Sequence, residues 1–185
     1  MHLVFRGKRP KTGFALAFFL AISTLLAQTE QTPATGAATA PAQDPILKVG
    51  GDVPTPAQLN LSDLSRMPRT DVRVKDRDGN EITYSGVSLT EVLRAAGLKL
   101  DPSSIPNRDI VGCYILVQAA DGYRAVFASA EVDPAQTDRF ILLADHKNGQ
   151  LLSANEGPFR IVFPGEKRPA RWVRQVQSIL VGRPE

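Results

Sequence analysis

Apolar and polar residues alternate along several parts of this chain. Residues 69–75 place Val72 and Val74 between charged or polar neighbours, and Asp-Gly-Asn at 78–80 separates this segment from a second one at 81–84. A period of two is typical of a strand with one face in water, and Asp-Gly is a common hairpin turn. The pattern therefore predicts a β-hairpin here.

Other short runs are rich in β-branched and large apolar residues and end at Gly, Asp, Asn or Pro. Such runs are typical of short strands. We expect strands at 46–49, 111–119, 123–128, 140–144, 159–163 and 176–181. Single helical turns are expected at 62–67, which Pro68 ends, and at 130–132.

The strongest helix signal lies at residues 88–97. Ser88 and Glu91 have the spacing of a capping box, and Gly97 is in place to end the helix. The apolar stripe between them consists of Leu89, Val92 and Leu93. Because many strands accompany one good helix without regular βα alternation, the pattern predicts a mixed α+β fold that is mainly β.

The N-terminal part has a different character. Four basic residues precede an uncharged, mostly apolar run at 13–27, which is typical of a secretory signal. The run is shorter than the roughly 20 residues that a membrane span needs, so cleavage after Ala27 is favoured over an uncleaved anchor. We expect residues 1–27 to be a signal peptide, 28–44 a flexible Ala/Thr/Pro/Gln linker and 45–185 the folded domain. The protein is thus expected to be exported, periplasmic or secreted, with no stable membrane span after cleavage.

The formal net charge of +3 changes once this signal is set aside. Four of the 22 Lys and Arg residues lie within it, which leaves 18 basic residues against 19 acidic ones, a balance of about −1. A dispersed phosphate-binding surface is not expected on such a domain, which argues against nucleic acid as a partner.

Few residues suit metal or nucleophilic chemistry. Beyond the signal the chain has one cysteine, Cys113, and one histidine, His146, so a His/Cys metal site of three or four ligands is not available within one subunit. Cys113 lies in an apolar run and is expected to be buried. No serine has the Gly-x-Ser-x-Gly context, and no glycine-rich phosphate loop is present. Acid–base chemistry would depend on Asp121, Glu131 or Asp145, which are expected to be solvated turn acids.

Cations gather near the C-terminus, beside the one tryptophan, Trp172. They are Arg160, Lys167, Arg168, Arg171 and Arg174. Guanidinium and ammonium groups presented together can hold a phosphate or pyrophosphate. The alternative is a solvated rim in which these cations pair with Glu156 or Glu166.

Several segments, in order, carry a resemblance to a known family. They are YSGVSLTEVLRAAG at 84–97, ADGY at 120–123 with AE at 130–131, LLA at 142–144 with NGQLL at 148–152, and EGPFRIVFPG at 156–165 with RWV at 171–173. With gaps from about Val49 to Val181, the chain resembles the molybdopterin-binding oxidoreductase domain of the sulfite oxidase family. The resemblance implies a mixed α+β fold that holds a molybdenum-bearing pterin, with Arg160, Lys167 and Arg171 as the residues that bind the cofactor phosphate.

One feature departs from that family. Its catalytic members ligate molybdenum through a cysteine upstream of the aromatic residue that matches Tyr84, but residues 73–75 contain none, and Cys113 lies beyond the helix. The leading interpretation is therefore an exported, stand-alone domain that binds a pterin or another small anion, with no catalytic residue assigned. Two alternatives remain: an active molybdenum-dependent oxidoreductase with a ligand other than cysteine, and a non-enzymatic periplasmic module that binds a partner protein.

Overall fold

The structure is a computed structural model that describes residues 44–76, 78–101 and 108–184. The chain divides into two compact units, Met1–Ala40 and Pro41–Glu185, and every described residue belongs to the second. The predicted signal peptide and nearly all of the predicted linker lie outside the described residues.

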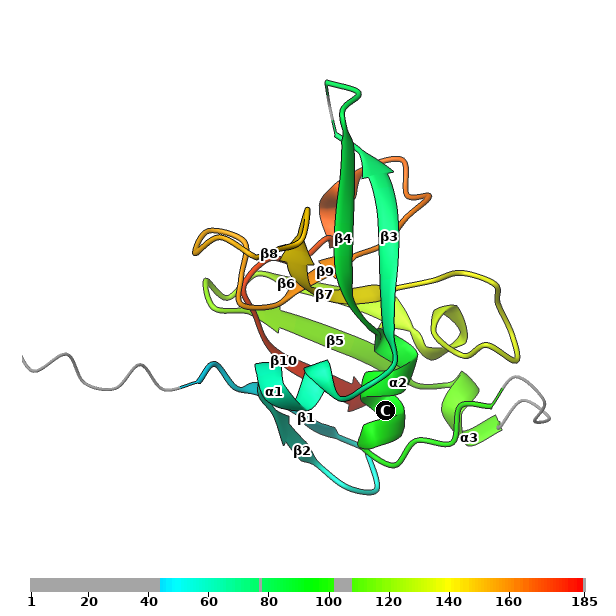
Figure 1. The fold of residues 1–185 in the computed structure, drawn as a ribbon. Coiled ribbons are helices and arrows are strands. Elements are labelled where there is room, and N and C mark those ends of the chain that lie inside the picture. Colours follow the sequence, from blue (N-terminus) through cyan, green and yellow to red (C-terminus); the bar gives the residue numbers. More distant parts are fainter. Residues whose placement is uncertain (1–43, 77, 102–107, 185) are drawn as a thin grey trace, which may run out of the picture. The chain divides into compact units, whose positions relative to one another are not determined.

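One sheet has five strands in the order β2–β1–β10–β5–β6 (Figure 1). Its strands are β1 Leu47–Gly51, β2 Ala57–Leu59, β5 Tyr114–Ala119, β6 Arg124–Ala128 and β10 Val176–Gly182. β1 runs parallel to β10, and the other neighbours are antiparallel. Strands from the two ends of the domain therefore lie side by side in this sheet.

The second sheet has the order β3–β4–β7–β8, and β9 pairs with β7 as well. Its strands are β3 Arg69–Lys75, β4 Glu81–Ser88, β7 Leu142–Lys147, β8 Gln150–Leu151 and β9 Arg160–Val162. The hairpin of β3 and β4 extends away from the rest of the domain (Figure 1). The predicted hairpin and the predicted mixed, mainly β fold are both confirmed.

The helices are short. They are α1 Leu61–Ser65, α2 Leu89–Ala95, α3 Arg108–Val111 and the 3₁₀ turns η1 Ser129–Glu131 and η2 Pro169–Arg171. None of the helices described in residues 44–184 is long and apolar enough to cross a membrane.

The ends of α2 show why this segment is helical. The Ser88 hydroxyl accepts a hydrogen bond from the Glu91 N–H at 3.1 Å, while the Glu91 carboxylate pairs with Arg94. Gly97 has φ of 87°, and its N–H donates to the Arg94 carbonyl at 2.8 Å. The Leu98 N–H reaches back to the Leu93 carbonyl at 3.2 Å, which completes a Schellman motif.

Some predicted strand limits were wrong. β5 begins at Tyr114 rather than 111, because Ile110 and Val111 belong to α3. β7 continues through 145–147, where the sequence suggested a turn, because β8 pairs with its end. The tight turn lies only at Asn148 and Gly149, both with positive φ. The short elements β2, β8 and α3 were not predicted.

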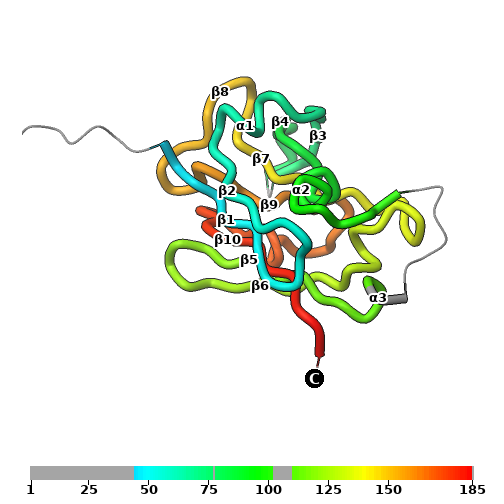
Figure 2. Tube along the Cα trace, turned by 90° about the horizontal axis from the view of Figure 1, so that it is seen from below, coloured from blue at the N-terminus to red at the C-terminus, as the bar shows by residue number. Residues whose placement is uncertain are grey.

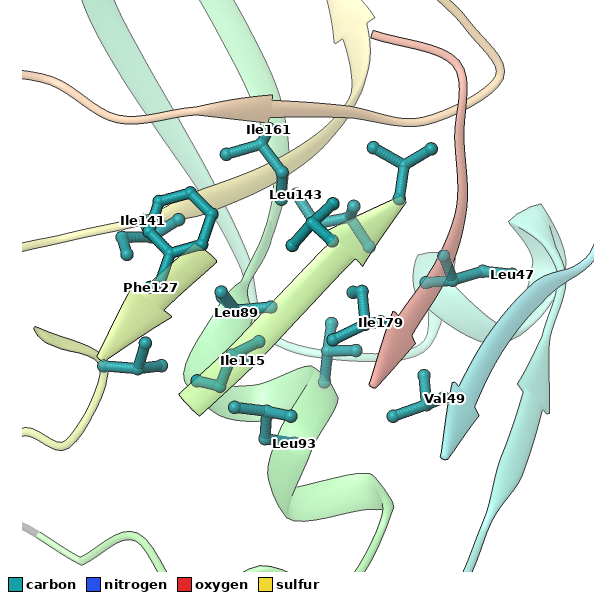
Figure 3. Close-up of a cluster of buried hydrophobic side chains, with 14 of the residues drawn as sticks. Leu47, Val49, Leu89, Leu93, Ile115, Phe127, Ile141, Leu143, Ile161 and Ile179 are labelled. Carbon is teal, nitrogen blue, oxygen red and sulfur yellow. The ribbon is translucent and has the colours of Figure 1, made fainter. Parts of the chain in front are cut away.

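The main hydrophobic core lies between the sheets. Side chains from β1, β5, β6, β7, β9, β10 and α2 meet there, together with Ile141 just before β7, and Figure 3 labels several of them, including Leu89, Phe127 and Ile161. Figure 2, turned by 90°, shows β3, β4, β7 and β8 on one side and β1, β10, β5 and β6 on the other, with β9 between them. A smaller cluster around Tyr84, Leu142, Ala144 and Val162 lies on the other face of the second sheet, and Trp172 packs against both clusters.

Candidate functional site

A cleft of about 390 Å³ lies beside the smaller cluster. Strand alternation places its apolar wall, because Val74 pairs with Ile82 across the hairpin and Tyr84 follows two positions later on the same face. The opposite wall comes from β9 and the region of η2. The side chains that matter there are Arg160, Glu166, Lys167 and Trp172. The volume of the cleft lies within the usual range of small-molecule sites.

Arg160 lies among aromatic rings at this cleft. Its guanidinium carbon is 5.3 Å from the ring centre of Tyr84 and 5.9 Å from that of Trp172. The two rings meet edge-on, with centres 6.4 Å apart, and the indole N–H donates to the Phe163 carbonyl at 3.0 Å. Cation–π contacts and an ion pair with Glu156 hold this side chain, which is only 13% exposed.

Two buried polar atoms of residues on the cleft wall have no hydrogen-bond partner in the part of the chain that the structure describes. They are Nε of Arg160 and Oε2 of Glu166. A buried donor or acceptor without a partner costs free energy, so native proteins leave few of them. The two residues that carry these atoms, Arg160 and Glu166, both line the cleft.

Arg171 lies beside the cleft and is held by two carboxylates. Its guanidinium donates to Glu131 at 2.9 and 3.2 Å and, through Nε, to Glu166 at 2.7 Å. It also lies 4.8 Å from the ring centre of Phe127 and 5.0 Å from that of Phe163. The hydrogen bonds from Arg171 lower the pKa of Glu131. Arg171 therefore organises the loop around Glu166.

The sequence-predicted cations thus lie in one region. Arg160 and Lys167 line the cleft, and Arg171 shares Glu166 with its wall. Arg160 pairs with Glu156 and Arg171 with Glu166, as expected if these cations formed a solvated rim. Both pairs are largely buried, however, which a solvated rim does not predict. Lys167, Arg168 and Arg174 are exposed. Cofactor binding by Arg160, Lys167 and Arg171 stays a prediction.

The residues that could ligate a metal lie elsewhere. Cys113 is buried in the core between the sheets, as its apolar context predicted, and does not line the cleft. Val74 and Lys75 border the cleft at the segment where the resembling family would place its cysteine. Within the described ranges, no group of three or more His, Cys, Asp or Glu side chains is arranged to hold a metal ion.

A second polar cluster, which the sequence did not indicate, lies on the opposite face of the second sheet. Asp145 is 2% exposed and accepts hydrogen bonds from both terminal nitrogens of Arg69, at 2.6 and 2.9 Å. His146 Nδ1 lies 2.6 Å from the same carboxylate. Burial alone raises the pKa of Asp145, but the bonds from Arg69 and His146 together outweigh it, so this pKa is lowered.

A bulge in β7 explains how adjacent residues share that cluster. Ser85 pairs with His146 and Gly86 with Ala144, so Asp145 is the extra residue. Of the three acids expected to be solvated, Asp121 is exposed, but Glu131 is half-buried and Asp145 buried. The expectation failed for Asp145 because the strand continues through it. The sequence signal that could have indicated this cluster is Asp145 followed by His146, directly after the apolar run at 140–144.

The fold and this site define a two-sheet α+β domain with an aromatic and cationic cleft on one sheet. A family model described as "Oxidoreductase molybdopterin binding domain" matches residues 36–185, and the chain belongs to this family. The family that the ordered segments indicated is therefore confirmed. No curated protein matches the chain.

Among solved structures, the chain is similar to the sulfane dehydrogenase SoxCD from Paracoccus pantotrophus. The two share 24% identity with a TM-score of 0.58, over 75% of this chain and 38% of that chain. The chain thus spans well under half the length of that protein. At this identity the similarity shows the fold.

Proposed function

We propose that this domain binds a small aromatic anion, a pterin that carries a phosphate, in the cleft. The observation that carries the proposal is Arg160. This cation lines the cleft, is only 13% exposed, and lies against the rings of Tyr84 and Trp172. Family membership supports a pterin as the aromatic group.

The residues of the cleft fit the organic part of such a ligand. Tyr84, Trp172 and the apolar side of the hairpin offer flat, apolar contact for a heterocycle. Lys167 is exposed, makes no ion pair among the described residues, and with Arg160 can donate charge-assisted hydrogen bonds to a phosphate.

The same residues do not fit a molybdenum centre of the thiolate type. The one cysteine is in the main core, and the cleft offers Val74 and Lys75 where a thiolate would be needed. Since the ligating atom sets the redox behaviour of a bound metal, the proposed function is binding of the pterin and not oxidation or reduction at molybdenum.

We also propose that the protein works after export. Support comes from the basic and then apolar character of residues 1–27, and the expected mature N-terminus is Gln28. N-terminal sequencing of the protein recovered from the periplasm or medium would check this. A chain that still begins at Met1 would contradict cleavage.

Binding can be followed through the cleft itself, because Trp172 is the one tryptophan of the chain and lies on the cleft wall. Titration with 6-hydroxymethylpterin monophosphate should quench its fluorescence in a saturable way. Arg160→Gln and Lys167→Ala should each weaken binding by about tenfold, the value expected for one charge-assisted hydrogen bond. Arg73→Gln removes an exposed cation outside the cleft lining and should have no effect.

Lys167→Ala changes an exposed side chain, so unfolding cannot account for its effect. Wild-type protein that shows no saturable quenching would refute the binding proposal. Metal analysis and pterin fluorescence of protein purified from its native host test whether molybdenum is bound: we expect pterin without molybdenum. Stoichiometric molybdenum would instead establish an enzyme with a ligand other than cysteine.

A further inference from the structure

A second hollow, of about 410 Å³, shares Glu166 and Lys167 with the cleft but not Tyr84 or Trp172. Its lining includes Arg139 from the segment before β7 and the loop that follows β9. We call it the basic hollow and define it by Arg139, Phe163, Gly165, Glu166, Lys167 and Arg168. Arg139 and Arg168 belong to this hollow and not to the cleft.

The charges around the basic hollow do not cancel. Glu131 and Glu166 are its neighbouring carboxylates, and Arg171 donates to both of them. Arg139 shares Glu131 at 3.1 Å, while Lys167 and Arg168 make no ion pair among the described residues. Four cations thus face two carboxylates, an excess of two positive charges.

Two of these cations, Arg139 and Arg171, lie against the same aromatic ring. The ring of Phe163, itself buried, lies 5.9 Å from the guanidinium carbon of Arg139 and 5.0 Å from that of Arg171. Because the guanidinium groups are already positioned by the ring and by Glu131, binding an anion costs less side-chain entropy than at free surface cations. Gly165 has φ of 82° and an open space where a side chain would stand, which leaves the mouth of the hollow clear.

We propose that the basic hollow binds a diphosphate group. The excess of two positive charges attracts a phosphoryl anion, and the volume of the hollow exceeds what one phosphate fills. Arginine forks at Arg139 and Arg168 provide bidentate donors for neighbouring phosphate oxygens. Glu166 and Lys167 line both spaces, but Arg139 and Arg168 do not line the cleft, so the inference does not rest on pterin binding.

Isothermal titration with inorganic pyrophosphate tests the proposal. Wild-type protein should bind pyrophosphate more tightly than orthophosphate, and affinity should fall with added salt. The double variant Arg139→Gln/Arg168→Gln should lose at least about tenfold in affinity. Arg160→Gln, which changes only the cleft, should bind pyrophosphate as the wild type does, so this test and the pterin test can fail separately.

Lys48→Gln/Arg73→Gln is the matched control. It removes the same two charges from exposed positions on β1 and β3 that make no ion pair among the described residues. Equal loss of affinity in this control would show a general effect of net charge and refute the site. Absence of pyrophosphate binding by the wild type would refute it as well. Should the double variant fold poorly, Arg168→Gln alone tests the proposal, because Arg168 is exposed and makes no ion pair with any described residue.

Diphosphate groups occur in soluble esters and in lipid headgroups. One further binding experiment distinguishes these two sources of the ligand. A soluble alkyl diphosphate and vesicles that carry a lipid diphosphate present the same group to Arg139 and Arg168. Binding of either that the double variant loses supports the proposal and identifies the source. Binding of both that the double variant keeps contradicts it.

Discussion

At the residue scale, the charged side chains of this domain are held by specific partners. Asp145 is buried, yet it keeps a lowered pKa because Arg69 and His146 both contact it. Glu131 behaves similarly beside Arg171. Removing one member of a buried pair leaves an uncompensated charge, so such pairs are sensitive to substitution and to pH.

The pairs predict how stability depends on pH. A carboxyl group with a folded-state pKa below its unfolded value of about 4 stabilises the fold above that value, and the contribution is lost as pH falls through the folded pKa. Asp145 and Glu131 both have lowered pKa values. The free energy of unfolding, measured with urea, should therefore decrease as pH falls from about 5 towards 3.

Asp145→Asn isolates one of these groups. At pH 7 it should lower the free energy of unfolding by about 3 kcal/mol, since Arg69 loses its charged partner. The difference from the wild type should shrink as pH falls below about 4, first because the carboxyl group of the unfolded wild type becomes protonated and then, at its lowered pKa, that of the folded state. Asp138→Asn, at an exposed residue outside this cluster, is the control. A difference that stays constant with pH would contradict the assignment.

At the element scale, the contact between β4 and β7 positions both faces of the second sheet. Tyr84 on β4 faces the cleft, whereas Ser85 pairs with His146 on the other face. The bulge at Asp145 lies next to Gly86, where the two backbones come close together. The φ of Gly86 is not positive, so any residue could adopt its backbone conformation. Glycine is needed at this position because there is no space for a Cβ atom.

Gly86→Ala should strongly disturb this pair of strands. An added Cβ would clash with the Leu143 carbonyl oxygen and lie 2.7 Å from the Ala144 Cα, and neither backbone atom can move away cheaply. We expect a loss of about 3 kcal/mol or more in the free energy of unfolding, at the upper end for overpacking. Gly112→Ala, with no atom within 4 Å of the added carbon, should change stability little. Equal stability of the two variants in urea denaturation would contradict the close approach.

At the scale of the whole molecule, two hydrophobic clusters are joined by Trp172. The larger lies between the sheets and the smaller on the outer face of the second sheet, and the indole contacts both. The same ring forms part of the cleft wall. Folding of the two sheets and formation of the cleft should therefore be coupled.

Calorimetry can measure that coupling. The wild-type domain should unfold in one transition, with calorimetric and van't Hoff enthalpies equal. Trp172→Ala should cost about 3 kcal/mol, the lower end for a large aromatic in a core, and lower the Tm by roughly 6–12 °C. Trp172→Phe keeps a ring but loses the hydrogen bond to Phe163 and should cost about 1 kcal/mol. Two separate transitions in the wild type would show that the sheets unfold independently.

Part of the site could be predicted from the sequence. The spacing of Arg160, Lys167 and Arg171 around a Pro-Gly turn indicated that these cations would lie together, and they do. The sequence did not indicate that Arg139 faces the same loop, or that Arg69 reaches Asp145, because 76 residues separate the latter pair. Long-range pairs follow from sheet order, which local patterns do not contain.

The sequence by itself determined the local elements: the hairpin at 69–84, the helix at 88–97 with its serine cap and glycine end, and the mainly β class. These depend on backbone preferences and on periodicity within a few residues. Only the tertiary structure decided the parallel pairing of β1 with β10, the bulge that buries Asp145, and which cations share a space. The physical reason is that burial and pairing are properties of the whole packed domain, and they arise once distant strands meet.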